Sequence, residues 1–76
     1  MIRYDEHAEF QIARRNIDKA WIEAVLRSPD TVEKGKTRQS FLKCLPGRHV
    51  MLRVVTALTD PDYVITAYFD RTRPCG

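Results

Sequence analysis

The spacing of apolar residues divides the chain into a helical part and a strand-forming part. In the first part apolar positions recur at helical spacing, and they predict one helix over about residues 5–15 and a second over about residues 18–28. Asp5 and Asp18 stand where these helices would begin, and aspartate is a favoured N-cap residue. Asn16 separates the helices and tolerates the left-handed backbone conformation, so we expect a tight corner there.

After the second helix the pattern changes to β-branched and alternating runs separated by Pro and Gly. These runs predict strands over about residues 31–34, 38–45, 49–58 and 63–69. The short turns between them favour antiparallel pairing. The expected fold is a single α+β domain over residues 1–76, with two N-terminal helices packed on a four-stranded, mainly antiparallel sheet. Residues 71–76 are expected to form a flexible tail.

Alternation along the predicted strands separates an apolar sheet face from a polar one. If the apolar face meets the helices, Arg53, Thr66 and Tyr68 lie together on the opposite face. Lys43 joins them unless it points inward, which an unpaired lysine rarely does. Such a face could bind phosphate through the arginine fork and use the tyrosine for stacking or proton transfer. The alternative is an ordinary solvated face on which a tyrosine packs against an arginine.

The two histidines have structural alternatives as well. His7 lies near the start of the first predicted helix, where the helix dipole favours a neutral ring that could act as a base. It could equally be a structural histidine that packs against the sheet. His49 follows a Gly-Arg turn and is expected to be a loop residue. The sequence has no metal-ligand spacing, glycine-rich phosphate loop or nucleophile elbow, so we expect no metal and no cofactor.

Composition and charge exclude few classes of fold or partner. The chain is 43% hydrophobic and 30% charged, which is typical of a folded soluble domain. Its net charge of +3 is compatible with nucleic acid or an acidic protein as a partner. With 76 residues the core is small, so a partner or an oligomer could supplement it.

Other features bear on the location of the protein. The first residues lack the apolar region of a signal peptide, and no apolar run is long enough to span a bilayer. Cys44 and Cys75 are far apart and have no metal-ligand spacing, so we expect no disulfide. The expected location is therefore cytoplasmic, without membrane contact.

The order of short motifs along the chain resembles a family of short bacterial proteins of unknown function. The motifs are His7-Ala8, Arg15-Asn16-Ile17, Ser28-Pro29, the basic strand Arg38 to Lys43, and Val64-Ile65-Thr66-Ala67-Tyr68. They keep the family's order and cover nearly the whole chain. Two positions depart from the common pattern. Gln11 stands where the family frequently has arginine, and Asn16 replaces glycine.

That family is similar in turn to the RelE/ParE-type toxins, small ribonucleases in which two helices pack on a twisted antiparallel sheet. The resemblance implies a RelE-like fold and a metal-independent ribonuclease toxin that acts on RNA and has a cognate antitoxin as its partner. The catalytic residues it implies are His7, Arg15, Arg53, Thr66 and Tyr68. His7 or Tyr68 would move protons, and the arginines would stabilise the phosphorane. The residues expected to contact nucleic acid are Arg38, Lys43 and Arg48.

Two other functions are open on the residues alone. The chain could be a non-catalytic module that binds a protein or nucleic acid with the same sheet face. It could also be a structural or regulatory subunit whose exposed edge strand pairs with another chain, including a second copy in a homodimer. Replacing Tyr68 by phenylalanine would abolish cleavage but leave binding, whereas a concentration-dependent melting temperature would indicate a subunit.

Overall fold

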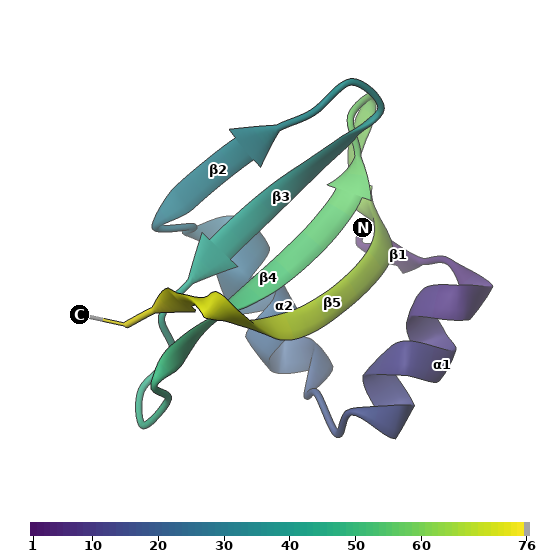
Figure 1. The fold of residues 1–76 in the computed structure, drawn as a ribbon. Helices are drawn as coiled ribbons and strands as arrows, with labels where there is room; N and C mark the ends of the chain where they lie inside the picture. Colours follow the sequence, from purple (N-terminus) through teal and green to yellow (C-terminus); the bar gives the residue numbers. More distant parts are fainter. Residues whose placement is uncertain (76) are drawn as a thin grey trace.

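The computed structural model describes residues 1–75 as two helices packed on one face of a twisted sheet (Figure 1). The helices are α1 (Glu6–Arg14) and α2 (Lys19–Arg27). The strands are β1 (Arg3–Tyr4), β2 (Thr31–Lys34), β3 (Arg38–Lys43), β4 (Val50–Ala57) and β5 (Asp60–Pro74). The predicted α+β class with two helices is confirmed.

The sheet has five strands in the order β1-β5-β4-β3-β2, one more than the four that we predicted. The additional strand is β1, which pairs parallel to β5 through Arg3 with Tyr63 and Tyr4 with Val64. All other neighbouring strands pair antiparallel, so the sheet is mixed. A two-residue strand is too short to give a periodic pattern, and its parallel partner lies far along the chain. For these reasons the sequence did not indicate β1.

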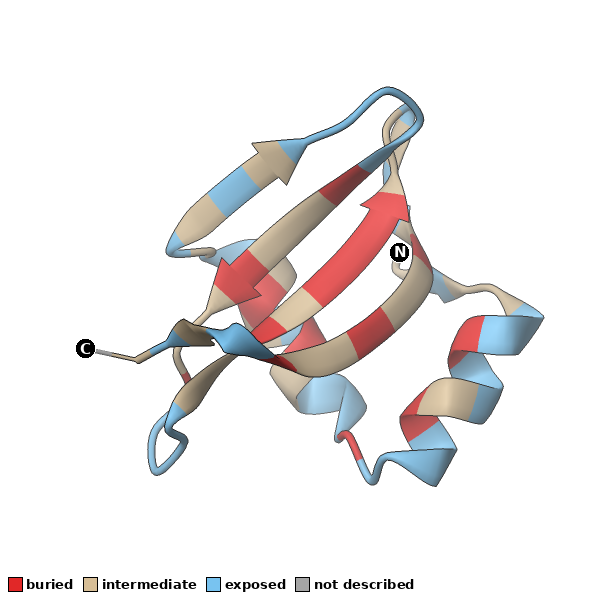
Figure 2. Ribbon diagram, viewed as in Figure 1, coloured by how far each residue is buried: buried red, intermediate tan, exposed pale blue. Residues whose placement is uncertain are grey.

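The core lies between the helices and the central strands, where the buried residues concentrate (Figure 2). Helical residues that contribute to it are Ala8 and Ile12 of α1 and Ile22 and Val25 of α2. Leu52, Val54, Val64 and Ala67 contribute from β4 and β5. Arg53, between Leu52 and Val54, and Tyr68, directly after Ala67, are a cross-strand pair and therefore share the opposite face. Side-chain alternation thus produces the two faces that the sequence pattern suggests.

Each helix begins at an aspartate that caps its first turn. The Asp5 carboxylate accepts from the backbone N–H of His7 at 3.0 Å, and the Asp18 carboxylate accepts from that of Ala20 at 2.8 Å. Asn16 adopts a left-handed conformation with φ of 55° between the helices. Its neighbour Ile17 returns to the core and donates from its backbone N–H to Ile12 at 3.0 Å. The corner therefore fixes how α1 and α2 lie on the sheet.

The C-terminal residues differ most from expectation. The segment expected as a flexible tail continues β5 to Pro74, and residue 76 lies outside the described residues. Cys44 and Cys75 form a disulfide between the end of β3 and the end of β5, with their Cα atoms 5.6 Å apart. The strand pairing shifts register here: Met51 pairs with Asp70, but Val50 pairs with Pro74. Because the cysteines are joined, their number no longer argues for a reducing compartment.

Candidate functional site

Arg15 reaches from the end of α1 to the outer edge of β5, beyond the two residues that pair with β1. Its guanidinium Nη1 donates to the carbonyl oxygen of Ala67 at 2.9 Å and lies 3.5 Å from the hydroxyl oxygen of Thr66. The guanidinium carbon is 5.7 Å from the centroid of the Tyr68 ring, which is within the range of a cation–π contact. Arg15, Thr66 and Tyr68 thus form one cluster, which we call the β5-edge site.

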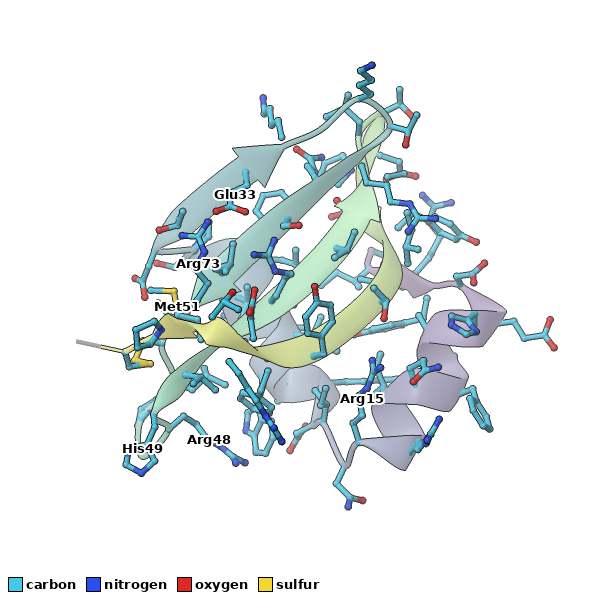
Figure 3. The ribbon with its side chains drawn as sticks, in the orientation of Figure 1. Arg15, Glu33, Arg48, His49, Met51 and Arg73 are labelled. Atoms are coloured by element: carbon cyan, nitrogen blue, oxygen red, sulfur yellow. A yellow bond between two sulfur atoms is a disulfide. The ribbon has the colours of Figure 1, made fainter. Side chains whose placement is uncertain are left out.

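Arg53 is the cross-strand neighbour of Tyr68, but carboxylates engage its side chain. Its Nε and Nη2 donate to Asp70 at 2.9 and 2.8 Å, and its Nη1 donates to Glu33 at 3.1 Å. Glu33 also pairs with Arg73 (Figure 3). With only 14% of its side chain exposed, Arg53 is enclosed by these partners. A buried charge depends on its partners, so Arg53 could contact a phosphate only by breaking one of these pairs.

Asp70 is held in its ionised form by hydrogen bonds from Thr72, two residues further along β5. The hydroxyl and the backbone N–H of Thr72 both donate to Asp70 Oδ1, at 2.6 and 2.9 Å. These hydrogen bonds, with a further contribution from Arg53, hold the pKa of the Asp70 carboxyl below its usual range. Asp70, the partner of Arg53, is therefore negatively charged at neutral pH.

His7 belongs to a different part of the surface. It is exposed in the first turn of α1, where its Nε2 lies 3.4 Å from the side-chain nitrogen of Gln11. It lines a shallow hollow with Asp5, Glu6 and Phe10. The hydroxyl of Tyr63 donates to Asp5 at 2.6 Å, which lowers the pKa of Asp5 and raises that of Tyr63. No member of the β5-edge site lines this hollow.

The three residues that we expected to contact nucleic acid are spread over the molecule. Arg38 and Lys43 are the first and last residues of β3, about 17 Å apart at 3.3 Å per residue. Lys43 lies opposite Leu52, on the helix side of the sheet, where it donates to the carbonyl oxygen of Ser28 at 2.8 Å. It therefore does not join the polar face. Arg48 lies in the turn between β3 and β4.

Sequence reasoning missed the residues that neutralise Arg53. Glu33 lies opposite Ser40, which in turn lies opposite Val55, so strand register carries Glu33 to the face of Arg53. The signal available in the sequence was the presence of acidic residues in strands that could lie next to the strand of Arg53. However, the set of carboxylates that faces an arginine depends on a register that the sequence does not reveal.

The described residues lack two further kinds of feature. Within residues 1–75, no group of three or more His, Cys, Asp or Glu side chains is arranged to hold a metal ion. None of the helices in that same range has the length and apolarity to cross a membrane.

Comparison with known proteins identifies the family of the chain. No curated protein and no solved structure matches the chain significantly. The model of one protein family does match, over residues 4–69, which is most of the chain and includes both helices and the β5-edge site. The chain therefore belongs to the family of the domain of unknown function DUF4258.

Proposed function

We propose that the chain acts on RNA in the manner of the RelE/ParE-type toxins, with the β5-edge site as its phosphate-binding centre. The observation that carries this proposal is the position of Arg15, whose guanidinium lies over the Tyr68 ring and beside the Thr66 hydroxyl. Among residues 1–75, the ion pairs do not involve Arg15. Its charge therefore stays available for a phosphate, and its planar fork suits that ligand.

The chemistry at this site would need no metal. The RNA 2′-hydroxyl would lose its proton to water and attack the adjacent phosphorus to form a 2′,3′-cyclic phosphate, and the bond to the 5′ oxygen of the next nucleotide would break. Arg15 would stabilise the negative charge that develops on the phosphoryl oxygens. The Tyr68 hydroxyl would give its proton to the leaving oxygen and regain one from water after cleavage. Thr66 would help to orient the guanidinium, since its hydroxyl lies 3.5 Å from Arg15 Nη1.

Two residues of the predicted catalytic set take other parts in this proposal. Arg53 is neutralised by Glu33 and Asp70, so its part is to hold neighbouring strands together beside Tyr68 and not to bind phosphate. His7 lines the hollow at the start of α1 and has no part in the proton transfer. The proposal therefore rests on the three residues of the β5-edge site alone.

A toxin of this kind would have a cognate antitoxin. An acidic partner would suit a site that presents an unpaired arginine, because complementary charge favours association. The product of a neighbouring gene is the first candidate, and co-expression with it should restore growth if the chain is toxic.

The test combines growth with direct RNA cleavage. Induced expression of the chain should arrest growth, and the purified protein should cleave single-stranded RNA in the presence of EDTA. Tyr68→Phe and Arg15→Ala should each abolish both effects. Tyr63→Phe is the matched control, because Tyr63 lies on the same strand but bonds to Asp5, and it should retain cleavage. Harmless expression together with intact RNA would rule out the enzyme.

A non-catalytic RNA-binding module is the second candidate. It is favoured by the engagement of Arg53 with two carboxylates, because Arg15 is then the arginine that the β5-edge site offers to a phosphate, whereas a nuclease would benefit from two at that site. In this case the protein binds RNA without cutting it. Arg15→Ala then weakens binding and lowers its salt dependence, whereas Tyr68→Phe, which keeps the ring, binds as the wild type does.

A further inference from the structure

The Arg48 guanidinium lies over an aromatic pair contributed by two other elements. Its guanidinium carbon lies 5.0 Å from the ring centroid of Trp21 in α2 and 4.7 Å from that of Phe69 in β5. The two rings meet edge to face, with centroids 6.3 Å apart and planes at 65°. The turn that carries Arg48 is closed by its backbone N–H, which donates to the carbonyl oxygen of Leu45 at 3.1 Å. The guanidinium is thus placed by packing and not by a carboxylate.

Like Arg48, Arg15 forms no ion pair with a carboxylate of residues 1–75. Within residues 1–75, the basic side chains that form ion pairs are Arg3, Lys19, Lys43, Arg53 and Arg73. Arg15 and Arg48 are absent from that set, yet aromatic rings hold both of them in place. Both residues are exposed, so each offers an oriented and unneutralised cation to the solvent.

The two arginines border the same stretch of β5. Tyr68 and Phe69 are consecutive residues, so their side chains project from opposite sides of the strand. Arg15 lies over the first ring and Arg48 over the second. Both labelled side chains lie along the lower margin of β5 in Figure 3. The pairing of β1 with β5 ends at Val64, so no strand formed by residues 1–75 covers this margin.

We propose that Arg48, supported by Trp21 and Phe69, is a second nucleotide subsite, and that single-stranded RNA crosses the β5 margin between Arg15 and Arg48. A guanidinium that is held over rings on one side can stack on a base with its other side, while its N–H groups reach a phosphate. Stacking of this kind tolerates any base and needs an unpaired strand. The subsite rests on the proposed function, because it extends the β5-edge site along the same ligand.

The test measures the affinity of the folded chain for a short single-stranded 2′-O-methyl RNA, which cannot be cleaved, by fluorescence anisotropy over a range of salt. Arg48→Gln and Arg15→Gln should each weaken binding about tenfold, the loss expected for one hydrogen-bonded charge. Each should also reduce the slope of log affinity against log salt by about 0.7. Arg27→Gln is the matched control, since it removes an exposed arginine from the last turn of α2 and should leave affinity and slope unchanged.

A conservative variant separates stacking from charge. Arg48→Lys keeps the charge but loses the planar group, so it should restore the wild-type salt slope while affinity stays reduced. Circular dichroism should show that each variant is folded, as expected for an exposed turn residue.

The possible results are distinguishable. If Arg48→Gln binds like Arg27→Gln while Arg15→Gln is weakened, the second subsite is wrong and the proposed function stands. If Arg15→Gln also binds normally, or if the wild type does not bind, both fail. If polyglutamate binds in an Arg48-dependent manner and RNA does not, the surface recognises an acidic protein and the RNA subsite is overturned.

Discussion

Arg53 lies between two carboxylates, and this arrangement determines what the central part of the polar sheet face can do. Asp70 contacts it from β5 and Glu33 from β2, so three strands are joined through one side chain. Removing one partner would leave a largely enclosed charge with fewer contacts, which is more costly than losing an exposed ion pair. The residue is therefore better suited to holding strands together than to binding a ligand.

The pH dependence of stability tests this network. Hydrogen bonds from Thr72, and then from Arg53, lower the pKa of Asp70 in the folded chain, so the unfolded chain binds a proton there more readily. Asp70 thus stabilises the fold above its unfolded pKa of about 3.9, and the contribution is lost as pH falls through the lower folded pKa. Urea unfolding between about pH 5 and pH 2 should show the free energy of unfolding of the wild type falling with acid, and less so for Asp70→Asn.

Glu23→Gln serves as the control because it removes an exposed carboxylate from outside the network. Its acid profile should match the wild type. Asp5, whose pKa is lowered chiefly by the hydrogen bond from Tyr63, adds to the wild-type decline and remains in both variants. An Asp70→Asn profile parallel to that of the wild type would contradict the proposed role of the network.

Among the elements, the corner between α1 and α2 decides where Arg15 points. Asn16 has a positive φ of 55°, which costs an ordinary residue roughly 1–2 kcal/mol and a glycine almost nothing. The backbone N–H of Asn16 donates to Ala13 at 3.2 Å, which helps to close the helix behind Arg15. The corner thus directs the Arg15 side chain toward β5.

Substitution of Asn16 tests whether this position needs a residue that tolerates a positive φ. Asn16→Gly should leave the free energy of unfolding within a few tenths of a kcal/mol of the wild type, whereas Asn16→Val should lower it by about 1–2 kcal/mol. Urea unfolding at neutral pH measures both variants. The glycine variant is the matched control, since both changes remove the same amide side chain. Equal stability of the two variants would show that the left-handed conformation is not the reason for asparagine here.

The elements of the fold differ in how far the sequence alone could predict them. The helices, their aspartate caps and the corner are local features, so residue spacing was sufficient for them. The placement of Arg53, Thr66 and Tyr68 followed from alternation, which is also local. In contrast, β1, the register that brings Glu33 to Arg53, and the reach of Arg15 to β5 depend on contacts between distant segments. No pattern within one segment encodes them.

At the scale of the whole molecule, the end of β5 is tied to the rest of the sheet. Cys75 is joined to Cys44 at the end of β3, and its backbone N–H donates to the carbonyl oxygen of His49 at 2.8 Å. Arg73 pairs with Glu33 of β2. The C-terminal segment therefore contacts three parts of the sheet or its turns. In a chain of 76 residues with a small core, such a link should matter for stability.

The disulfide links residues separated by 31 positions, and closing a loop of that size restricts the unfolded chain. The chain-entropy relation gives about 3–4 kcal/mol for this restriction. Cys75→Ser should therefore lower the free energy of unfolding by an amount of this order, and dithiothreitol should lower the melting temperature of the wild type but not of the variant. Cys44→Ser should match Cys75→Ser, because either change removes the same link. If air-refolded wild-type protein reacts with two equivalents of N-ethylmaleimide before reduction, the link does not form and the prediction fails.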